Sequence, residues 1–90
     1  MSVYVKNVIM IEGQVQKKRI AELEADGYYV IKLMKTNKNG MPDILAIKPG
    51  ADVIFSEVKT KKGVVSKLQE FRIKELKGYG FKAEVYREGQ

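Results

Sequence analysis

Residues 43–60 read DILAIKPGADVIFSEVKT and hold two short apolar runs separated by a turn. Pro42 precedes the first run, and a proline is tolerated at the start of a strand but not inside a central one, so a strand is expected over 43–48. Residues 49–52, Pro-Gly-Ala-Asp, are typical of a turn. The second run, 53–60, is rich in β-branched and aromatic residues and predicts a second strand. The stretch therefore predicts two neighbouring strands of one sheet.

The second of these strands changes character along its length. Successive side chains of a strand point to opposite faces of the sheet, so Glu57 and Lys59 share a face with Val53 and Phe55. The strand begins apolar on both faces, as a buried strand does, and becomes polar on one face at its C-terminal end. It therefore delivers a carboxylate and an amine side by side at the edge of the core.

The N-terminal half predicts one helix and one further strand. Residues 11–25 have a helical composition, and Gly27 follows them as a residue able to take the left-handed conformation that ends a helix. Residues 28–34 are aromatic and branched and predict a strand, and the turn at 36–40 ends in Asn-Gly. Residues 3–8 carry a weaker strand pattern.

The C-terminal half predicts a helix and a last strand. Ser66 and Gln69 have the form of a capping box, which predicts a helix from Ser66 to about Lys77. Its core-facing residues are expected to be Leu68, Phe71 and Leu76. Residues 81–86 alternate between apolar and polar side chains and predict a strand.

The resulting order, α-β-β-β-α-β, places the chain in the α/β class, as a small mixed sheet flanked by two helices in a single domain over 1–90. A domain of this size buries only roughly 60% of the surface of its unfolded chain, so oligomerisation is a natural way to add core.

The chain contains neither cysteine nor histidine. This composition excludes disulfides, thiolate zinc sites and catalysis by imidazole, so any bound metal must be a hard cation held by oxygen, such as Mg²⁺, Mn²⁺ or Ca²⁺. The first eleven residues lack a signal-peptide pattern and no run approaches ~20 apolar residues, so an intracellular, cytoplasmic protein with no membrane contact is expected.

The net charge of +6 is concentrated in the middle of the chain. Residues 1–26 and 78–90 each sum to zero, whereas 27–56 carry +2 and 57–77 carry +4. A basic surface around carboxylates suggests a polyanion guided onto a metal site, although a solvated lysine-rich face would give the same pattern.

Asp43 and Glu57 offer hard anionic ligands from neighbouring strands, and the backbone carbonyl of Val58 is expected to point into the same space. Mg²⁺ commonly takes only one or two protein carboxylates and keeps water and phosphate oxygens. Lys59, on the face of Glu57, is placed to orient a water or stabilise a phosphorane in phosphodiester hydrolysis. The bare pattern also fits a solvent-side salt bridge.

The same residues resemble the PD-(D/E)XK nuclease signature, and in detail the VRR-NUC family. The motifs that carry this resemblance run in order along nearly the whole chain: Glu12-x-x-Val15-Gln16, Gly27, Gly40-x-Pro42-Asp43, Glu57-x-Lys59-Thr60, Ser66-x-x-Gln69, and a glycine break at Gly78 and Gly80.

The resemblance implies a restriction-endonuclease-like core and a Mg²⁺- or Mn²⁺-dependent endodeoxyribonuclease. Some members are stand-alone, phage-encoded homodimers similar to Holliday-junction resolvases, so branched or flapped DNA and a second copy are the implied partners. The metal ligands implied by the resemblance are Asp43 and Glu57, to which the strand geometry adds the backbone carbonyl of Val58. The implied catalytic residues are Asp43, Glu57, Lys59, the accessory acid Glu12, and Gln69, for which helix capping is an equally good interpretation.

Exposed cations are expected to contact the DNA backbone. They are Lys35, Lys38, Lys61, Lys62 and Lys67, with Arg72 and Lys74 as further candidates. Three alternatives to a junction-cutting enzyme stay open: a non-catalytic basic module that binds nucleic acid, a flap or nicking nuclease of the same fold, and a purely structural oligomer.

Overall fold

The computed structural model describes residues 10–89 of the 90-residue chain. Its elements are α2 (Glu12–Ala25), β1 (Tyr29–Lys32), β2 (Ile44–Ile47), β3 (Ile54–Lys59), α3 (Lys67–Gly78) and β4 (Lys82–Arg87). The predicted order α-β-β-β-α-β is confirmed. The weak strand pattern at 3–8 lies outside the described residues.

The four strands form one mixed sheet in the order β1-β2-β3-β4. The first three are antiparallel neighbours, with Ile44 opposite Ser56 in the β2–β3 pair. β4 runs parallel to β3, with Val85 beside Glu57, and α3 makes the crossover between them. By this topology the loop after β1, the C-terminal end of β3 and the start of α3 all meet at the same end of the sheet.

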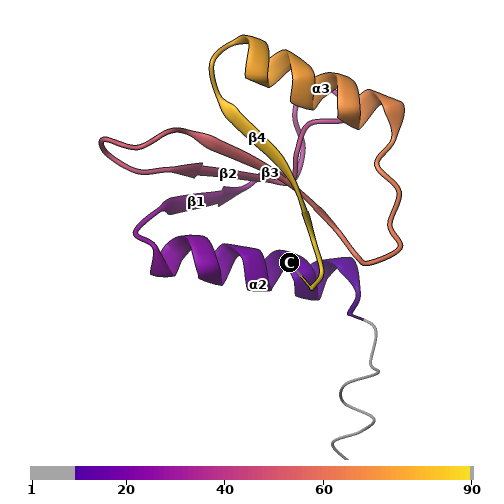
Figure 1. Ribbon diagram of the computed structural model, residues 1–90, viewed down its shortest axis with the longest axis horizontal. Coiled ribbons are helices and arrows are strands. Elements are labelled where there is room, and N and C mark those ends of the chain that lie inside the picture. The colour runs from indigo at the N-terminus through magenta and orange to yellow at the C-terminus, as the bar shows by residue number, and fades with distance from the viewer. Residues whose placement is uncertain (1–9, 90) are drawn as a thin grey trace, which may run out of the picture.

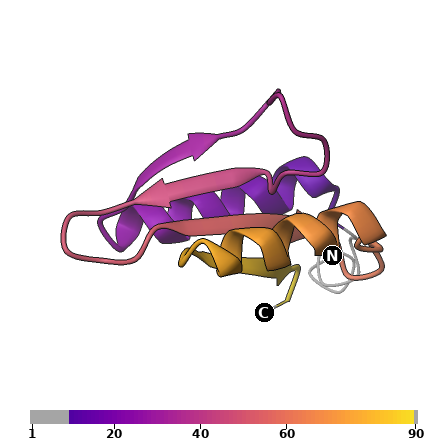
Figure 2. The same ribbon diagram turned by 90° about the horizontal axis from the view of Figure 1, so that it is seen from above.

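The two helices cover opposite faces of the sheet (Figure 1). The face toward α2 buries a cluster made of Val15, Leu23, Ile44, Ala46, Val58 and Tyr86. The face toward α3 buries Phe55, Ile73, Leu76 and Ala83. Figure 2 shows α3 lying along β4 and away from β1. Because α3 covers only part of its face, the apolar side chains of Tyr29, Ile31 and Ile47 stay exposed.

The orientation of α3 corrects one prediction. Leu76 is buried as expected, but the prediction that Leu68 and Phe71 face the core is wrong, since they are 43% and 54% exposed. The helix turns Gln69, Ile73 and Leu76 toward the sheet, because residues three and four apart share one face. This orientation of the helix places Phe71 on the side that faces away from the sheet.

A polar network fixes α2 against the sheet on the side away from α3. The buried Ser56 hydroxyl donates to Glu84 Oε2 at 2.6 Å, and Arg19 Nε donates to the same oxygen at 2.9 Å. Tyr86 donates its hydroxyl to Glu22 Oε2 at 3.0 Å, and burial raises the pKa of this tyrosine. These groups are hydrogen-bonded to one another, and they fix β3, the strand that carries Glu57, on its α2 face.

Candidate metal and catalytic site

The register of β2 and β3 brings the two candidate carboxylates face to face. Ile44 lies opposite Ser56, so the next position outward sets Asp43 opposite Glu57. Directly opposite residues of an antiparallel pair have Cβ atoms about 4.5–5.5 Å apart. The two acids therefore meet at the point where the β2–β3 ladder ends.

Asp43 is held by the backbone on both sides. Its Oδ2 accepts the N–H of Val58 at 2.8 Å, and its carbonyl accepts the N–H of Leu33 at 2.7 Å. The carbonyls of Val53 and Lys59 accept bonds from the β4 side. The N–H and the carbonyl of one residue point to the same side of a strand, so the Val58 carbonyl is expected on the Asp43 side; its role as a metal ligand stays a prediction.

Glu57 is almost fully enclosed, at 1% exposure, and its two oxygens have different surroundings. Oε2 accepts a hydrogen bond from Gln69 Nε2 at 3.0 Å and lies 3.6 Å from Lys59 Nζ. Oε1 is buried and has no hydrogen-bond partner within residues 10–89. A buried oxygen left without a partner is costly, so this atom marks a place for a proton or a cation.

The electrostatics of the pair keep Glu57 protonated to a higher pH than an ordinary glutamate. Burial, and then the negative charge of Asp43, raise the pKa of Glu57 from 4.5 to about 7, against the opposing effect of the Lys59 ammonium. Two carboxylates that share one site hold a proton between them unless another positive charge replaces it.

Gln69 links this carboxylate to the start of α3. Its side-chain Oε1 accepts the N–H of Ser66 at 2.9 Å, while Ser66 Oγ accepts the N–H of Gln69 at 3.1 Å. Helix capping and contact with the candidate site, which the sequence leaves as two interpretations, thus occur together.

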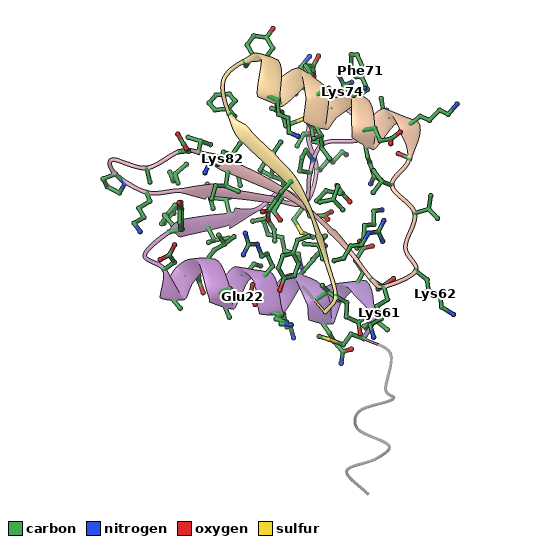
Figure 3. All side chains as sticks on the ribbon, viewed as in Figure 1. Glu22, Lys61, Lys62, Phe71, Lys74 and Lys82 are labelled. Carbon is green, nitrogen blue, oxygen red and sulfur yellow. The ribbon has the colours of Figure 1, made fainter. Side chains whose placement is uncertain are left out.

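The loop between β3 and α3 is tied to the C-terminal end of β4. Arg87 donates to the carbonyls of Gly63 at 2.6 Å and Thr60 at 3.2 Å, and the Lys61 N–H donates to Glu88 at 3.4 Å. Lys61 and Lys62 lie exposed on this loop at the site's end of the sheet (Figure 3). No pattern in the amino-acid sequence indicates this anchoring by the end of β4.

The remaining predicted residues are spread around the site. Glu12 is exposed at the first position of α2, which covers the opposite face of the sheet from the one Glu57 points to. Lys35 and Lys38 are exposed on the β1–β2 connection, and Lys67 is exposed at the first position of α3. The structure therefore assembles Asp43, Glu57, Lys59 and Gln69 and leaves Glu12 outside that group; its accessory role stays a prediction.

The donor set suits a hard divalent cation. It comprises the unpartnered Oε1 of Glu57, the carboxylate of Asp43 and the backbone carbonyl of Val58, all oxygen. Within residues 10–89 no group of three or more Asp, Glu, His or Cys side chains gathers as a metal site. A site of two carboxylates matches the preference of Mg²⁺, which fills its other positions with water and substrate phosphate.

Comparisons with known proteins identify the family and the fold of the chain. The family model described as "VRR-NUC domain" matches residues 6–88. A solved structure described as "VRR_NUC domain" is similar at 31% sequence identity and a TM-score of 0.75, over 86% of this chain and 84% of that chain. Among curated proteins no match is found. In the described part of the chain, no helix has the length and apolar character needed to cross a bilayer.

Proposed function

Because the chain belongs to the VRR-NUC domain family, whose domains are of nuclease type, we propose that it is a metal-dependent endonuclease that hydrolyses phosphodiester bonds of DNA. The observation that carries the proposal is the pairing of Asp43 with a buried Glu57 whose Oε1 has no partner within residues 10–89. A buried carboxylate pair beside an ammonium group contributes little to the stability of the fold, whereas carboxylates with shifted pKa values are typical of functional sites.

The roles of the residues follow from their surroundings. Asp43, Glu57 and the Val58 carbonyl would hold Mg²⁺ or Mn²⁺, which when bound supplies an activated water and neutralises charge on the phosphate. Lys59 Nζ, on a side chain only 12% exposed, orients water or stabilises negative charge on the phosphate oxygens. Gln69 keeps the Glu57 carboxylate in place through Oε2.

We place the substrate preference in DNA structure and not in base sequence. The described elements include no helix offered as a major-groove reader, and the exposed lysines are suited to phosphate contacts, which carry no sequence information. The proposed substrates are branched DNA, with a Holliday junction as the first choice and flapped or nicked duplex as the alternatives.

A homodimer completes the proposal, since two copies related by a two-fold axis present two sites to two strands. Support comes from the exposed apolar side chains of Tyr29, Ile31 and Ile47, on the face that α3 leaves uncovered, and from the limited core of so small a domain. Light scattering of the wild type and of Ile31→Glu tests this part: a dimer that the substitution dissociates supports it, and a wild-type monomer contradicts it.

Cleavage of a labelled DNA panel tests the activity. Four-way junction, 5′ flap, nicked duplex, plain duplex and single strand are each incubated with Mg²⁺, Mn²⁺, Ca²⁺ or EDTA, beside the Glu57→Ala variant. Paired symmetric cuts in the junction that disappear with EDTA and in the variant support a resolvase-like nuclease. Preference for another branched form supports the flap or nicking alternative, and cutting by the variant at the wild-type rate contradicts the site.

The ion pair of Lys59 with Glu57 is the observation that favours a second candidate, a binding module without chemistry. The two candidates differ in their response to metal. A cation that binds the folded state raises thermal stability with the logarithm of its concentration above the dissociation constant, whereas a structural salt bridge gives no such response. DNA binding with neither a Mn²⁺-dependent shift in Tm nor cleavage would establish the binding module.

A further inference from the structure

The connection between β1 and β2 forms an open pocket of about 230 Å³ at the end of the sheet that carries the candidate site. Residues 33–36 and 38–41 line it. Thr36 Oγ1 donates to the carbonyl of Lys38 at 2.6 Å and accepts the N–H of the same residue at 3.3 Å, so the turn has internal support. The pocket ends at Met41, two residues before Asp43.

One side of α3 packs against the connection between β1 and β2. Arg72 Nε donates to the carbonyl of Asn39 at 2.8 Å. Leu68 packs on Gly40 so tightly that a Cβ atom there would lie 2.7 Å from the Leu68 Cγ atom. Phe71 adjoins this side of α3, since it lies three residues after Leu68 and next to Arg72. We call the pocket and this side of α3 together the α3–loop surface: residues 33–41 with Leu68, Phe71 and Arg72.

Phe71 gives this surface an exposed aromatic ring. The ring is 54% exposed, and the guanidinium carbon of Arg72 lies 5.3 Å from its centroid. Figure 3 shows Phe71 and Lys74 on the side of α3 that points away from the sheet. Arg72, itself held by Asn39 and by Glu75 at 3.1 Å, restrains the ring without covering it. The fold gains little from a ring placed in this way.

The rim of the surface is cationic. Lys35 and Lys38 stand on the loop, and Lys67 and Lys74 stand one turn before and one turn after Phe71 on α3; all four are exposed. None of the four forms an ion pair within residues 10–89, and residues 33–41 contain no acid. An aromatic ring framed by unpaired lysines is complementary to a nucleic acid strand with accessible bases, because bases stack on the ring and phosphates meet the ammonium groups.

We propose that the α3–loop surface binds an unpaired DNA strand, with a base stacked on Phe71 and the neighbouring phosphates on the lysines. In a duplex each base is already stacked and paired, so only an unpaired strand can use the ring. The surface adjoins the candidate site, since Leu68 precedes Gln69 and Met41 closely precedes Asp43. The inference rests on the proposed nuclease function and supplies a physical cause for its preference for branched or flapped DNA.

Fluorescence tests the stacking directly, because the chain contains no tryptophan. Phe71→Trp introduces a single reporter at the ring position, and the probe is oligo(dT)12 in EDTA, so that no cleavage occurs. The emission is expected to fall on addition of the oligonucleotide and to change little with a blunt duplex of equal phosphate content. Emission that responds to neither, or to both equally, overturns the proposal.

Affinity supplies the second measurement, with an exposed aromatic residue just after the helix as the control. Stacking on an aromatic side chain predicts that Phe71→Ala weakens oligo(dT)12 binding by roughly 5-fold to 150-fold, while Phe71→Trp keeps it. Tyr79 is 78% exposed beyond the other end of α3, so Tyr79→Ala should leave binding unchanged. Equal losses in both alanine variants, or a change of oligomeric state in Phe71→Ala alone, would show that the ring serves another purpose and overturn the proposal.

Failure of this inference is distinguishable from failure of the proposed function. Phe71→Ala retaining wild-type single-strand affinity, beside wild-type metal-dependent cleavage, overturns the inference and leaves the nuclease intact. If the wild type cleaves nothing, the nuclease fails, yet the binding experiments in EDTA still decide whether this surface takes an unpaired strand.

Discussion

Gln69 and Glu57 are joined by a hydrogen bond of 3.0 Å whose direction is fixed from the far side of the amide. Gln69 Oε1 accepts the N–H of Ser66, so Nε2 must face the Glu57 carboxylate. The opposite amide orientation would set N–H against N–H and oxygen against oxygen. The helix cap thus occupies Oε2 of Glu57, whereas Oε1 has no hydrogen-bond partner within residues 10–89.

We therefore expect Gln69→Ala to weaken Mn²⁺ binding and cleavage by about 10-fold to 100-fold, as is typical when a group that orients a metal ligand is removed. Calorimetric titration with Mn²⁺ measures the first effect without relying on activity. Glu70→Ala, one residue along on an exposed position, is the control for helix stability. Identical behaviour of the two variants would contradict a role for the amide beyond capping.

The raised pKa of Glu57 makes the stability of the metal-free protein depend on pH. The folded state holds the proton up to about 7, whereas the unfolded chain releases it near the ordinary value of 4.5. The stabilising contribution is therefore present below pH 4.5 and is lost as the pH rises toward 7, by about 3 kcal/mol over that window. Urea unfolding of the wild type and of Glu57→Gln between pH 4.5 and 7.5 isolates this effect.

The difference in stability between these two proteins should move in favour of Glu57→Gln as the pH rises, because a neutral amide cannot ionise. Added Mn²⁺ should reduce the loss of stability with rising pH in the wild type alone, since a bound cation compensates the negative charge that Glu57 gains beside Asp43. A difference that stays constant with pH would show that the buried carboxylate does not hold its proton in this window.

The lysines of the β3–α3 loop should act through long-range attraction to phosphate. Each of Lys61→Ala and Lys62→Ala is expected to weaken binding to all DNA forms alike and to reduce the slope of log affinity against log salt by about 1. Lys82→Ala is the control, since Lys82 lies at the other end of the sheet (Figure 3). There its Nζ is 3.5 Å from Asp52 Oδ2. An unchanged salt slope in both loop variants would show that these lysines do not contact the phosphates of DNA.

Two glycines offer opposite effects of the same substitution. Gly40 has φ +80° and no room beside Leu68, so Gly40→Ala should destabilise the protein by more than about 1 kcal/mol. Gly78, at the end of α3, has open space around it, and Gly78→Ala should stabilise by about 0.5–1 kcal/mol. Thermal unfolding of both variants provides the comparison; equal shifts would contradict the close packing of the loop on α3.

The element order was predictable because each segment carries a strong local pattern, and the cap from Ser66 to Gln69 formed as its spacing indicates. The rotation of α3 was not. Leu68 with Phe71 and Ile73 with Leu76 both satisfy the three-residue spacing of a buried stripe, so hydrophobicity alone offered two solutions. Gln69 distinguishes the two solutions. If its amide is assigned to the candidate site, Ile73 and Leu76 must also face the sheet, because they lie on the same side of the helix as Gln69.

For the candidate site, the sequence indicated Asp43, Glu57 and Lys59 through strand parity and spacing. The register that sets Asp43 opposite Glu57 depends on the turn at 49–52 and on the burial of Ile44. The unequal surroundings of the two Glu57 oxygens depend on where α3 docks, and the hydrogen bond from Arg72 to Asn39 joins α3 to a loop 33 residues away in the sequence. Local patterns do not encode contacts of that range.

The placement of both carboxylates on one antiparallel pair also has a consequence for how the chain folds. The hydrogen bond from Val58 to Asp43 spans 15 residues of sequence and the one from Gln69 to Glu57 spans 12, so both close short loops. β4 follows Gln69 in the chain and supplies none of the four residues that the candidate site brings together. The assembled group is therefore contained in one contiguous stretch, residues 43–69, and its contacts are local in sequence although the sheet itself needs a parallel crossover.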